Sequence, residues 1–137
     1  MFHIYAQESA IVLAGAGLGW IALFSFVVAP VAFKSWDVGR ADRLVRNVIK
    51  AGHGVLAFIA LLSAAAALFS GAIAGAVVAA LAAIFALCCQ WALAPRDDPK
   101  PIMGRKVMKT ARVVASALTA LIMPVLIASI LLTRMGI

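Results

Sequence analysis

One stretch of this chain, Ala51–Pro95, contains no Lys, Arg, Asp or Glu. Its length is about twice the roughly 20 apolar residues with which a single helix crosses a bilayer. The only interruption near its middle is Ser70-Gly71, followed by Gly75. A chain in lipid must satisfy its backbone hydrogen bonds internally, so two helices joined by a tight turn are the most economical fold. The stretch therefore predicts a helical hairpin that crosses a membrane twice.

The composition agrees with this interpretation. Hydrophobic residues make up 66% of the 137-residue chain and charged residues only 12%, whereas a soluble domain is about 25% charged. The net charge of +7 could indicate a nucleic-acid-binding protein, but eleven of the twelve Lys and Arg fall in Lys34–Lys50 and Arg96–Arg112. Both segments flank long apolar runs, which is the charge pattern of membrane topology rather than of a phosphate-binding surface. We therefore expect membrane lipids as partners and no nucleic acid.

Two more apolar runs flank the hairpin, so the chain predicts an all-α fold, an integral membrane bundle of four transmembrane helices. Residues 1–137 are expected to form this single domain, with spans at about 9–33, 48–69, 72–94 and 113–132. With four spans, the basic loops 34–47 and 95–112 lie on one side, and their excess of Lys and Arg predicts that this side is cytoplasmic. Both termini are then non-cytoplasmic, and the expected location is the cell inner (plasma) membrane.

The first span contains glycines at a spacing that favours close helix packing. Gly15 and Gly19 form a small-xxx-small pattern, which lets two helix backbones approach closely. The pattern predicts a helix contact on this face but does not indicate the partner helix. Pro30 lacks a backbone donor near the end of the span, which predicts a bend or an early end there.

The first basic loop has a helical pattern of its own. Arg40, Arg43 and Lys50 share one face of an interfacial helix or of the first turns of the second span. Trp36 is expected at headgroup level. This basic face either binds anionic lipid headgroups or provides ordinary positive-inside anchoring. The second basic loop also places its cations on one helical face: Arg105, Lys109 and Arg112.

Four polar residues in the apolar runs are candidates for an intramembrane polar site: His53, Cys88, Cys89 and Gln90. His53, near the expected start of the second span, is either an interfacial side chain hydrogen-bonded to a neighbour or a haem ligand. A second histidine ligand is not expected, because His3 should lie on the opposite side of the membrane. The adjacent thiols either bind a soft metal or act as small buried hydrophobic groups. Gln90 is expected to hydrogen-bond another helix or to line a polar pocket.

The sequence lacks the signals of several other functions. No Asp or Glu occurs within the four expected spans, which disfavours a proton-coupled transporter or a cation channel, because both usually place one there. No glycine-rich phosphate loop, HExxH or GxSxG pattern is present, so we expect no enzyme. We also expect no metal site and no resident cofactor, with haem and a soft metal as the alternatives.

Two short stretches carry a resemblance to a known family. Phe26-Val27, Pro30 and Phe33-Lys34-Ser35 end the first span, and the third span ends in Gln90-Trp91-Ala92-Leu93-Ala94-Pro95-Arg96. Over roughly residues 13–96 the chain resembles the domain-of-unknown-function 4149 family, relatives of transmembrane protein 205. Cys89 or Gln90 stands where that family tends to have Asn. The resemblance implies a four-helix membrane protein and supplies no established activity.

These observations predict a small integral membrane protein of structural or accessory type. We expect it to associate with itself or to serve as a subunit of a larger membrane complex, because a chain with so few polar groups is suited to work by contact. Two alternatives stay open. A transporter for a small solute or a thiophilic metal ion requires a polar cavity at Cys88, Cys89 or Gln90. A haem-binding membrane protein requires His53 and a second ligand.

Overall fold

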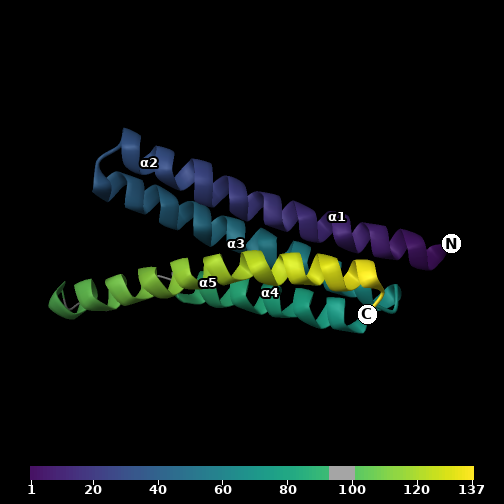
Figure 1. Ribbon diagram of the computed structural model, residues 1–137. Coiled ribbons are helices and arrows are strands. Elements are labelled where there is room, and N and C mark those ends of the chain that lie inside the picture. Colours follow the sequence, from purple (N-terminus) through teal and green to yellow (C-terminus); the bar gives the residue numbers. More distant parts are fainter. Residues whose placement is uncertain (93–100) are drawn as a thin grey trace.

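The fold is known from a computed structural model that describes residues 1–92 and 101–137. Within these, the side chains outside the description are those of Phe33, Val38, Gly39, Asp42, Ala115 and residues 101–113. The described residues form four helices that pack side by side, each long and apolar enough to span a membrane (Figure 1). The predicted fold class, an all-α bundle of four such helices, is confirmed. The elements are α1 (Phe2–Leu23), continued by the π-helical turn η1 (Phe24–Val28) and by α2 (Ala29–Ser35), then α3 (Val38–Phe69), α4 (Ile73–Ala92) and α5 (Pro101–Met135).

The first helix is longer than the sequence pattern indicated. It begins at Phe2 rather than near residue 9, and it does not end at Pro30. The π-helical turn η1 precedes the proline instead, and the Ala29 N–H donates to the Phe24 carbonyl, five residues back. A proline ring clashes with the carbonyl four residues before it, here that of Phe26, and an extra residue in the preceding turn relieves this clash. The helix therefore continues beyond the proline as α2.

The second helix shows that the first basic segment forms the opening turns of a span, not a separate interfacial helix. α3 runs without a break from Val38 to Phe69. At about 1.5 Å per residue, its 32 residues measure about 48 Å, against a hydrocarbon thickness of about 30 Å. The part that qualifies as a membrane span begins at Arg43. Arg40 therefore precedes this span, and the other basic residues of α3 lie in its first turns: Arg43, Arg46 and Lys50.

The predicted hairpin is present, and its turn lies at residues 70–72. Gly71 takes a left-handed conformation with a φ of 79°, which glycine adopts without steric cost. The Ala72 N–H donates to the Ala67 carbonyl and the Gly71 N–H to the Leu68 carbonyl, both at 3.0 Å. These two bonds form a Schellman motif, which satisfies carbonyls left open at the end of α3. α4 then begins at Ile73.

The last helix, α5, begins at Pro101 and continues through Pro124 to Met135. The backbone of the expected second basic loop is therefore helical from Pro101 onward. The part of that loop before Pro101 lies outside the described residues. The basic side chains predicted on this loop also lie outside the description: Arg105, Lys109 and Arg112.

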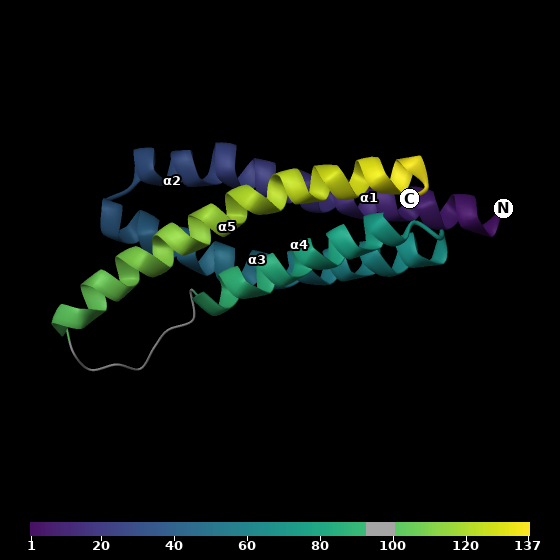
Figure 2. The same cartoon turned by 60° about the horizontal axis from the view of Figure 1, so that its bottom comes forward.

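Both termini lie at one end of the bundle, beside the turn that joins α3 to α4 (Figure 1). The Gly75 N–H of α4 donates to the Ile137 carbonyl at 3.1 Å, and Nε2 of Gln7 on α1 donates to the Thr133 carbonyl at 2.7 Å. The end of α2 and the starts of α3 and α5 lie at the opposite end (Figure 2). We call these the terminal end and the basic end. Which of them faces the cytoplasm stays a prediction.

All four helices contribute to the core, and the contribution of α4, which contacts both α3 and α5, consists of small residues. In lipid no hydrophobic force drives helices together, so the close approach that small residues permit supplies much of the packing energy. The first helix is less enclosed by its neighbours than the next two. In its most apolar stretch 22% is buried, against 39% in the most apolar stretches of α3 and α4. The buried residues of α4 recur at spacings of three and four and are all Gly, Ala or Cys: Gly75, Ala76, Ala79, Ala82, Ala83, Ala86 and Cys89.

Candidate functional site

A buried histidine lies where α3, α4 and α5 meet. His53 of α3 is only 2% exposed. Its Nδ1 lies 3.0 Å from the carbonyl oxygen of Ile49, and its Nε2 lies 3.2 Å from Oγ1 of Thr119 on α5. Because a carbonyl only accepts, a singly protonated ring carries its proton on Nδ1 and accepts the Thr119 hydroxyl at Nε2. The ring is thus hydrogen-bonded to its neighbours, but inside the bundle rather than at an exposed helix start, since α3 begins at Val38.

Cys89 of α4 belongs to the same group of side chains. It is fully buried, and its Sγ lies 3.8 Å from Oγ1 of Thr119. When the Thr119 hydroxyl donates to His53, the Cys89 thiol is the donor toward Thr119. The donors then point in one direction, from Cys89 through Thr119 to His53. We call these three residues the polar cluster; it links α3, α4 and α5 by side-chain hydrogen bonds.

The structure leaves the other two predicted polar residues outside this cluster. Cys88 is exposed while Cys89 is buried, because consecutive helix residues point about 100° apart. The adjacent thiols therefore do not converge on one metal. Gln90 is half-buried and packs against Gly54 of α3, where a Cβ would lie 3.3 Å from the Gln90 Nε2. The missing side chain at Gly54 makes room for this amide.

Thr119, which connects the polar cluster, was not among the predicted site residues. Serine and threonine in membrane helices commonly bond a carbonyl of their own helix, so the sequence does not separate Thr119 from the other hydroxyl residues of the spans. Only the packing of α5 against α3 and α4 places it beside His53 and Cys89. No local sequence signal could have found this contact.

Hydroxyl groups also join the helices closer to the terminal end. Oγ of Ser129 on α5 donates to the Gly75 carbonyl of α4 at 3.0 Å. Oγ of Ser63 on α3 donates to the Ala10 carbonyl of α1 at 2.9 Å. Among the described residues, every buried side-chain nitrogen or oxygen has a hydrogen-bond partner. These polar groups therefore hold helices together in a bundle whose interior offers no solvent to pair with.

The two glycines predicted to pack closely have open space beside them in the described part of the chain. A Cβ placed at Gly15 or Gly19 would meet nothing within 4 Å. The close approach of α1 occurs at Gly17 instead, where a Cβ would lie 3.0 Å from Cδ1 of Leu56. The buried face of α1 follows spacings of four and three that the sequence already contains: Ala10, Ala14, Gly17 and Ile21.

The described basic residues at the start of α3 lie on the surface. Arg40, Arg43 and Lys50 are all exposed, so they are available to lipid headgroups or to water. Whether they bind a lipid or only anchor the helix at the membrane surface depends on the shape of the protein surface beside them.

The fold and these contacts define a small multi-pass membrane protein, by the length and apolar character of its four helices. No protein-family model, curated protein or solved structure matches the chain. The resemblance noted in the sequence stays a prediction. Among the described residues, no group of three or more His, Cys, Asp or Glu is placed so that it could hold a metal ion.

Proposed function

We propose that this protein is a non-catalytic structural or accessory component of the inner (plasma) membrane. It works by contact, either with a second copy of itself or with other membrane subunits. The observation that carries the proposal is the outward face of α1, which has small side chains where the outward face of α4 has large ones.

The outward face of α1 has Ala16 and Gly19 in its middle, between Val12 and Leu23, which are 69% and 53% exposed, and the half-buried Gly15 lies at its edge. Among the described residues, no neighbouring atom lies within 4 Å of a Cβ placed at either glycine. Helices in lipid associate through such faces, because small residues let the backbones approach and gain van der Waals contact. A helix of another protein molecule would complete the packing that this chain leaves open.

The outward face of α4 differs from that of α1. Apart from Cys88, its exposed residues are large and apolar, as expected for a surface that meets lipid tails. They leave no shallow stripe along which a second helix could lie close to the backbone. The large exposed residues of α4 are Ile73, Val77, Leu81, Ile84, Leu87 and Trp91.

The polar cluster supports a packing role more than transport or haem binding. A transporter needs a polar cavity at Cys89 or Gln90, whereas Cys89 is fully buried and contacts Thr119. A haem iron would have to displace Thr119 from the Nε2 of His53. The cluster's polar groups are instead directed at one another and at the Ile49 carbonyl, which suits a fixed contact among three helices.

The proposal is tested by purifying the protein from its native membranes in a mild detergent, with mass spectrometry of what co-purifies. We expect a stoichiometric assembly, and mass spectrometry shows whether it contains further copies or other subunits. Gly19→Leu should disrupt it, because the added side chain fills the open stripe. The matched control is Ala65→Leu, which enlarges a small exposed residue on α3 and should leave the assembly intact.

Two results would count against this function. A wild-type protein that purifies alone as a monomer from native membranes has no partner to contact. An assembly that survives Gly19→Leu unchanged does not depend on the outward face of α1. An absorption spectrum of the same sample tests the haem alternative directly, since a Soret band would require a ligand role for His53.

A further inference from the structure

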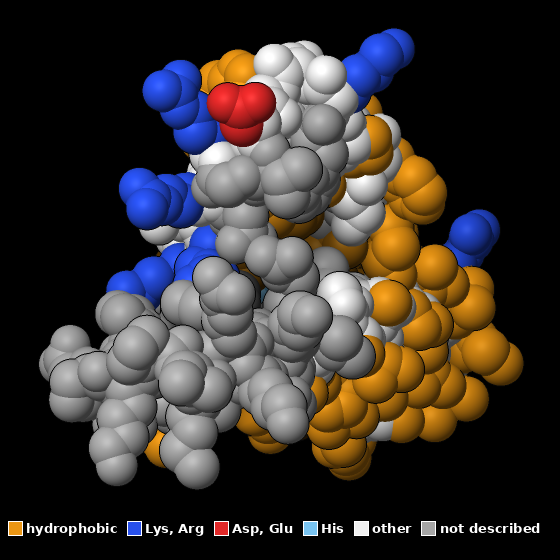
Figure 3. Space-filling view, turned by 90° about the vertical axis from the view of Figure 1, so that its left-hand side faces the viewer, with side chains coloured by type: hydrophobic (Ala, Val, Ile, Leu, Met, Phe, Trp, Pro, Cys, Tyr) orange, Lys and Arg blue, Asp and Glu red, His pale blue; other side chains and the backbone are white. Residues whose placement is uncertain are grey.

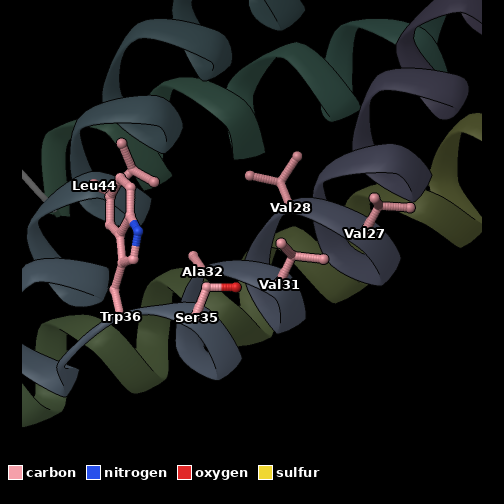
Figure 4. Close-up of a pocket in the computed structure, with 7 residues that line it drawn as sticks. All are labelled: Val27, Val28, Val31, Ala32, Ser35, Trp36 and Leu44. Carbon is pink, nitrogen blue, oxygen red and sulfur yellow. The ribbon is translucent and has the colours of Figure 1, made fainter.

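An apolar groove lies between the end of the first helix and the start of α3. Its volume is about 400 Å³, and seven residues line it. Trp36 and Leu44 form one wall and the valines of η1 and α2 the other, with Ser35 between them (Figure 4). The π-helical turn that accommodates Pro30 supplies two of these valines. The lining residues are Val27, Val28, Val31, Ala32, Ser35, Trp36 and Leu44.

A second hollow of about 310 Å³ adjoins this groove and is polar. Ser35 and Trp36 line both hollows, and Arg40 and Asp37 complete the second one. Because the two hollows share Ser35 and Trp36, we treat them together as one depression, with the apolar groove as one part and the hollow beside Asp37 and Arg40 as the charged part. Trp36, 51% exposed, stands at the boundary between the two parts, which is where tryptophan prefers to lie at a membrane surface.

The charge around the polar hollow is mainly positive. Lys34 and Arg43 are exposed near it on α2 and α3, and Figure 3 shows Lys and Arg side chains gathered at this end with an acidic one among them. The first turn of α3 adds backbone N–H groups without intrahelical partners and the positive end of the helix dipole. The Asp37 carboxylate carries the opposite, negative charge. Its side chain makes no capping hydrogen bond to α3.

We propose that this depression binds one anionic phospholipid, with an acyl chain in the apolar groove and the phosphate group beside Arg40. An apolar slot joined to a cationic pocket, with a tryptophan between, matches the two chemically distinct parts of such a lipid. A zwitterionic lipid fits the groove equally well but gains less from Arg40. This inference does not rest on the proposed contact at Gly19 on the outward face of α1, because Gly19 is not among the residues that line the depression.

The test is a titration of the full chain in mild detergent, followed by native mass spectrometry. Phosphatidylglycerol and phosphatidylcholine with the same acyl chains are compared, and inorganic phosphate is titrated separately. We expect one phosphatidylglycerol to bind about fivefold more tightly than phosphatidylcholine, since a basic residue near a membrane surface contributes about that factor. Inorganic phosphate should bind far more weakly, because it leaves the apolar groove empty.

Three substitutions and one control separate the parts of the depression. Arg40→Gln should lower phosphatidylglycerol binding about fivefold and phosphatidylcholine binding much less. Asp37→Asn should raise phosphatidylglycerol binding, because it removes the opposing charge. Val31→Trp should weaken both lipids by filling the groove from its exposed wall. The control is Arg134→Gln, which removes the same charge at the terminal end and should leave binding unchanged.

Two outcomes would overturn the proposal. Equal losses from Arg40→Gln and Arg134→Gln would show that only the overall charge of the protein matters. A phosphate that binds as tightly as the lipid, together with full lipid binding by Val31→Trp, would show a free-phosphate site that does not use the groove. All four substituted residues are surface positions, and a thermal melt of each variant in detergent verifies that it is folded.

Discussion

Two stripes of small residues in this protein have the same spacing and opposite uses. On α4, Gly75 and Ala79 are buried between neighbouring helices; on α1, Gly15 and Gly19 meet nothing within 4 Å of a Cβ. Both pairs follow the small-xxx-small pattern that permits close packing. The pattern therefore indicates that a helix backbone can be approached closely, but not whether the approaching helix belongs to the same chain.

The difference follows from position in the bundle. α4 has α3 on one side and α5 on the other, so its small residues are covered on two faces. α1 also contacts α3 and α5, but through Ala14, Gly17 and the other residues of its buried face. Its outward face carries the exposed Ala16 and Gly19, with the half-buried Gly15 beside them. Substitutions in the two stripes should accordingly affect different properties: folding for α4 and assembly for α1.

The largest effect is expected for Gly75→Leu. A Cβ at Gly75 would overlap Oγ1 of Thr133 and lie 3.0 Å from the Thr133 backbone nitrogen, and a backbone cannot move aside cheaply. We expect the free energy of unfolding to fall by about 3 kcal/mol, measured by reversible unfolding in mixed micelles. The control, Gly15→Leu, should unfold like the wild type. If Gly75→Leu and Gly15→Leu lowered the free energy of unfolding equally, the stripes on α4 and α1 would not differ in their role in folding.

A smaller effect is expected for Thr119→Val, which keeps the shape of the side chain and removes its hydroxyl. Nε2 of His53 would then be buried without its donor, and the free energy of unfolding should fall by about 1–2 kcal/mol. The same substitution in a His53→Leu background should cost less, because the buried His53 ring that loses its donor is no longer present. The polar cluster would have no role in stability if Thr119→Val cost the same in both backgrounds.

The smallest effect is expected at the terminal end. Nε2 of Gln7 donates to the carbonyls of Thr133 and Arg134, at 2.7 and 3.3 Å, in a partly exposed position. Gln7→Met keeps the length of the side chain and should cost about 0.5 kcal/mol. Hydrogen exchange should show faster opening of the first turns of α1 without change in α4. Unchanged exchange at these turns would contradict the contact.

The four-helix architecture could be predicted from the sequence because long apolar runs and clustered cations have few solutions in a membrane. Helix ends were less predictable: the π-helical turn before Pro30 keeps the first helix intact, and neither propensity nor hydropathy indicates such a turn. The site was predictable only in part. His53 and Cys89 were expected to be polar positions in a span, but their junction at Thr119 depends on how α5 packs.

The glycine pattern of α1 is visible in the sequence, but the sequence does not separate the glycines that face the bundle from those that face outward. Gly15 and Gly19 indicate close packing, and the sequence cannot show that Gly17, between them, is the glycine that packs inside the chain. Resolving the two faces of α1 requires knowing which residues α3 and α5 cover. That information lies in the tertiary contacts and not in any window of the sequence.

The central claim, that the outward face of α1 meets another protein, is tested most directly by photo-crosslinking in intact cells. A photoreactive amino acid replaces Leu23, a large residue that borders the small-residue stripe and is 53% exposed, so that the stripe itself stays open. As a control it replaces Leu87 on the outward face of α4, which is 48% exposed. We predict a discrete protein adduct from position 23 and none from position 87. The absence of a protein adduct at position 23, or the same adducts from both positions, would contradict the account.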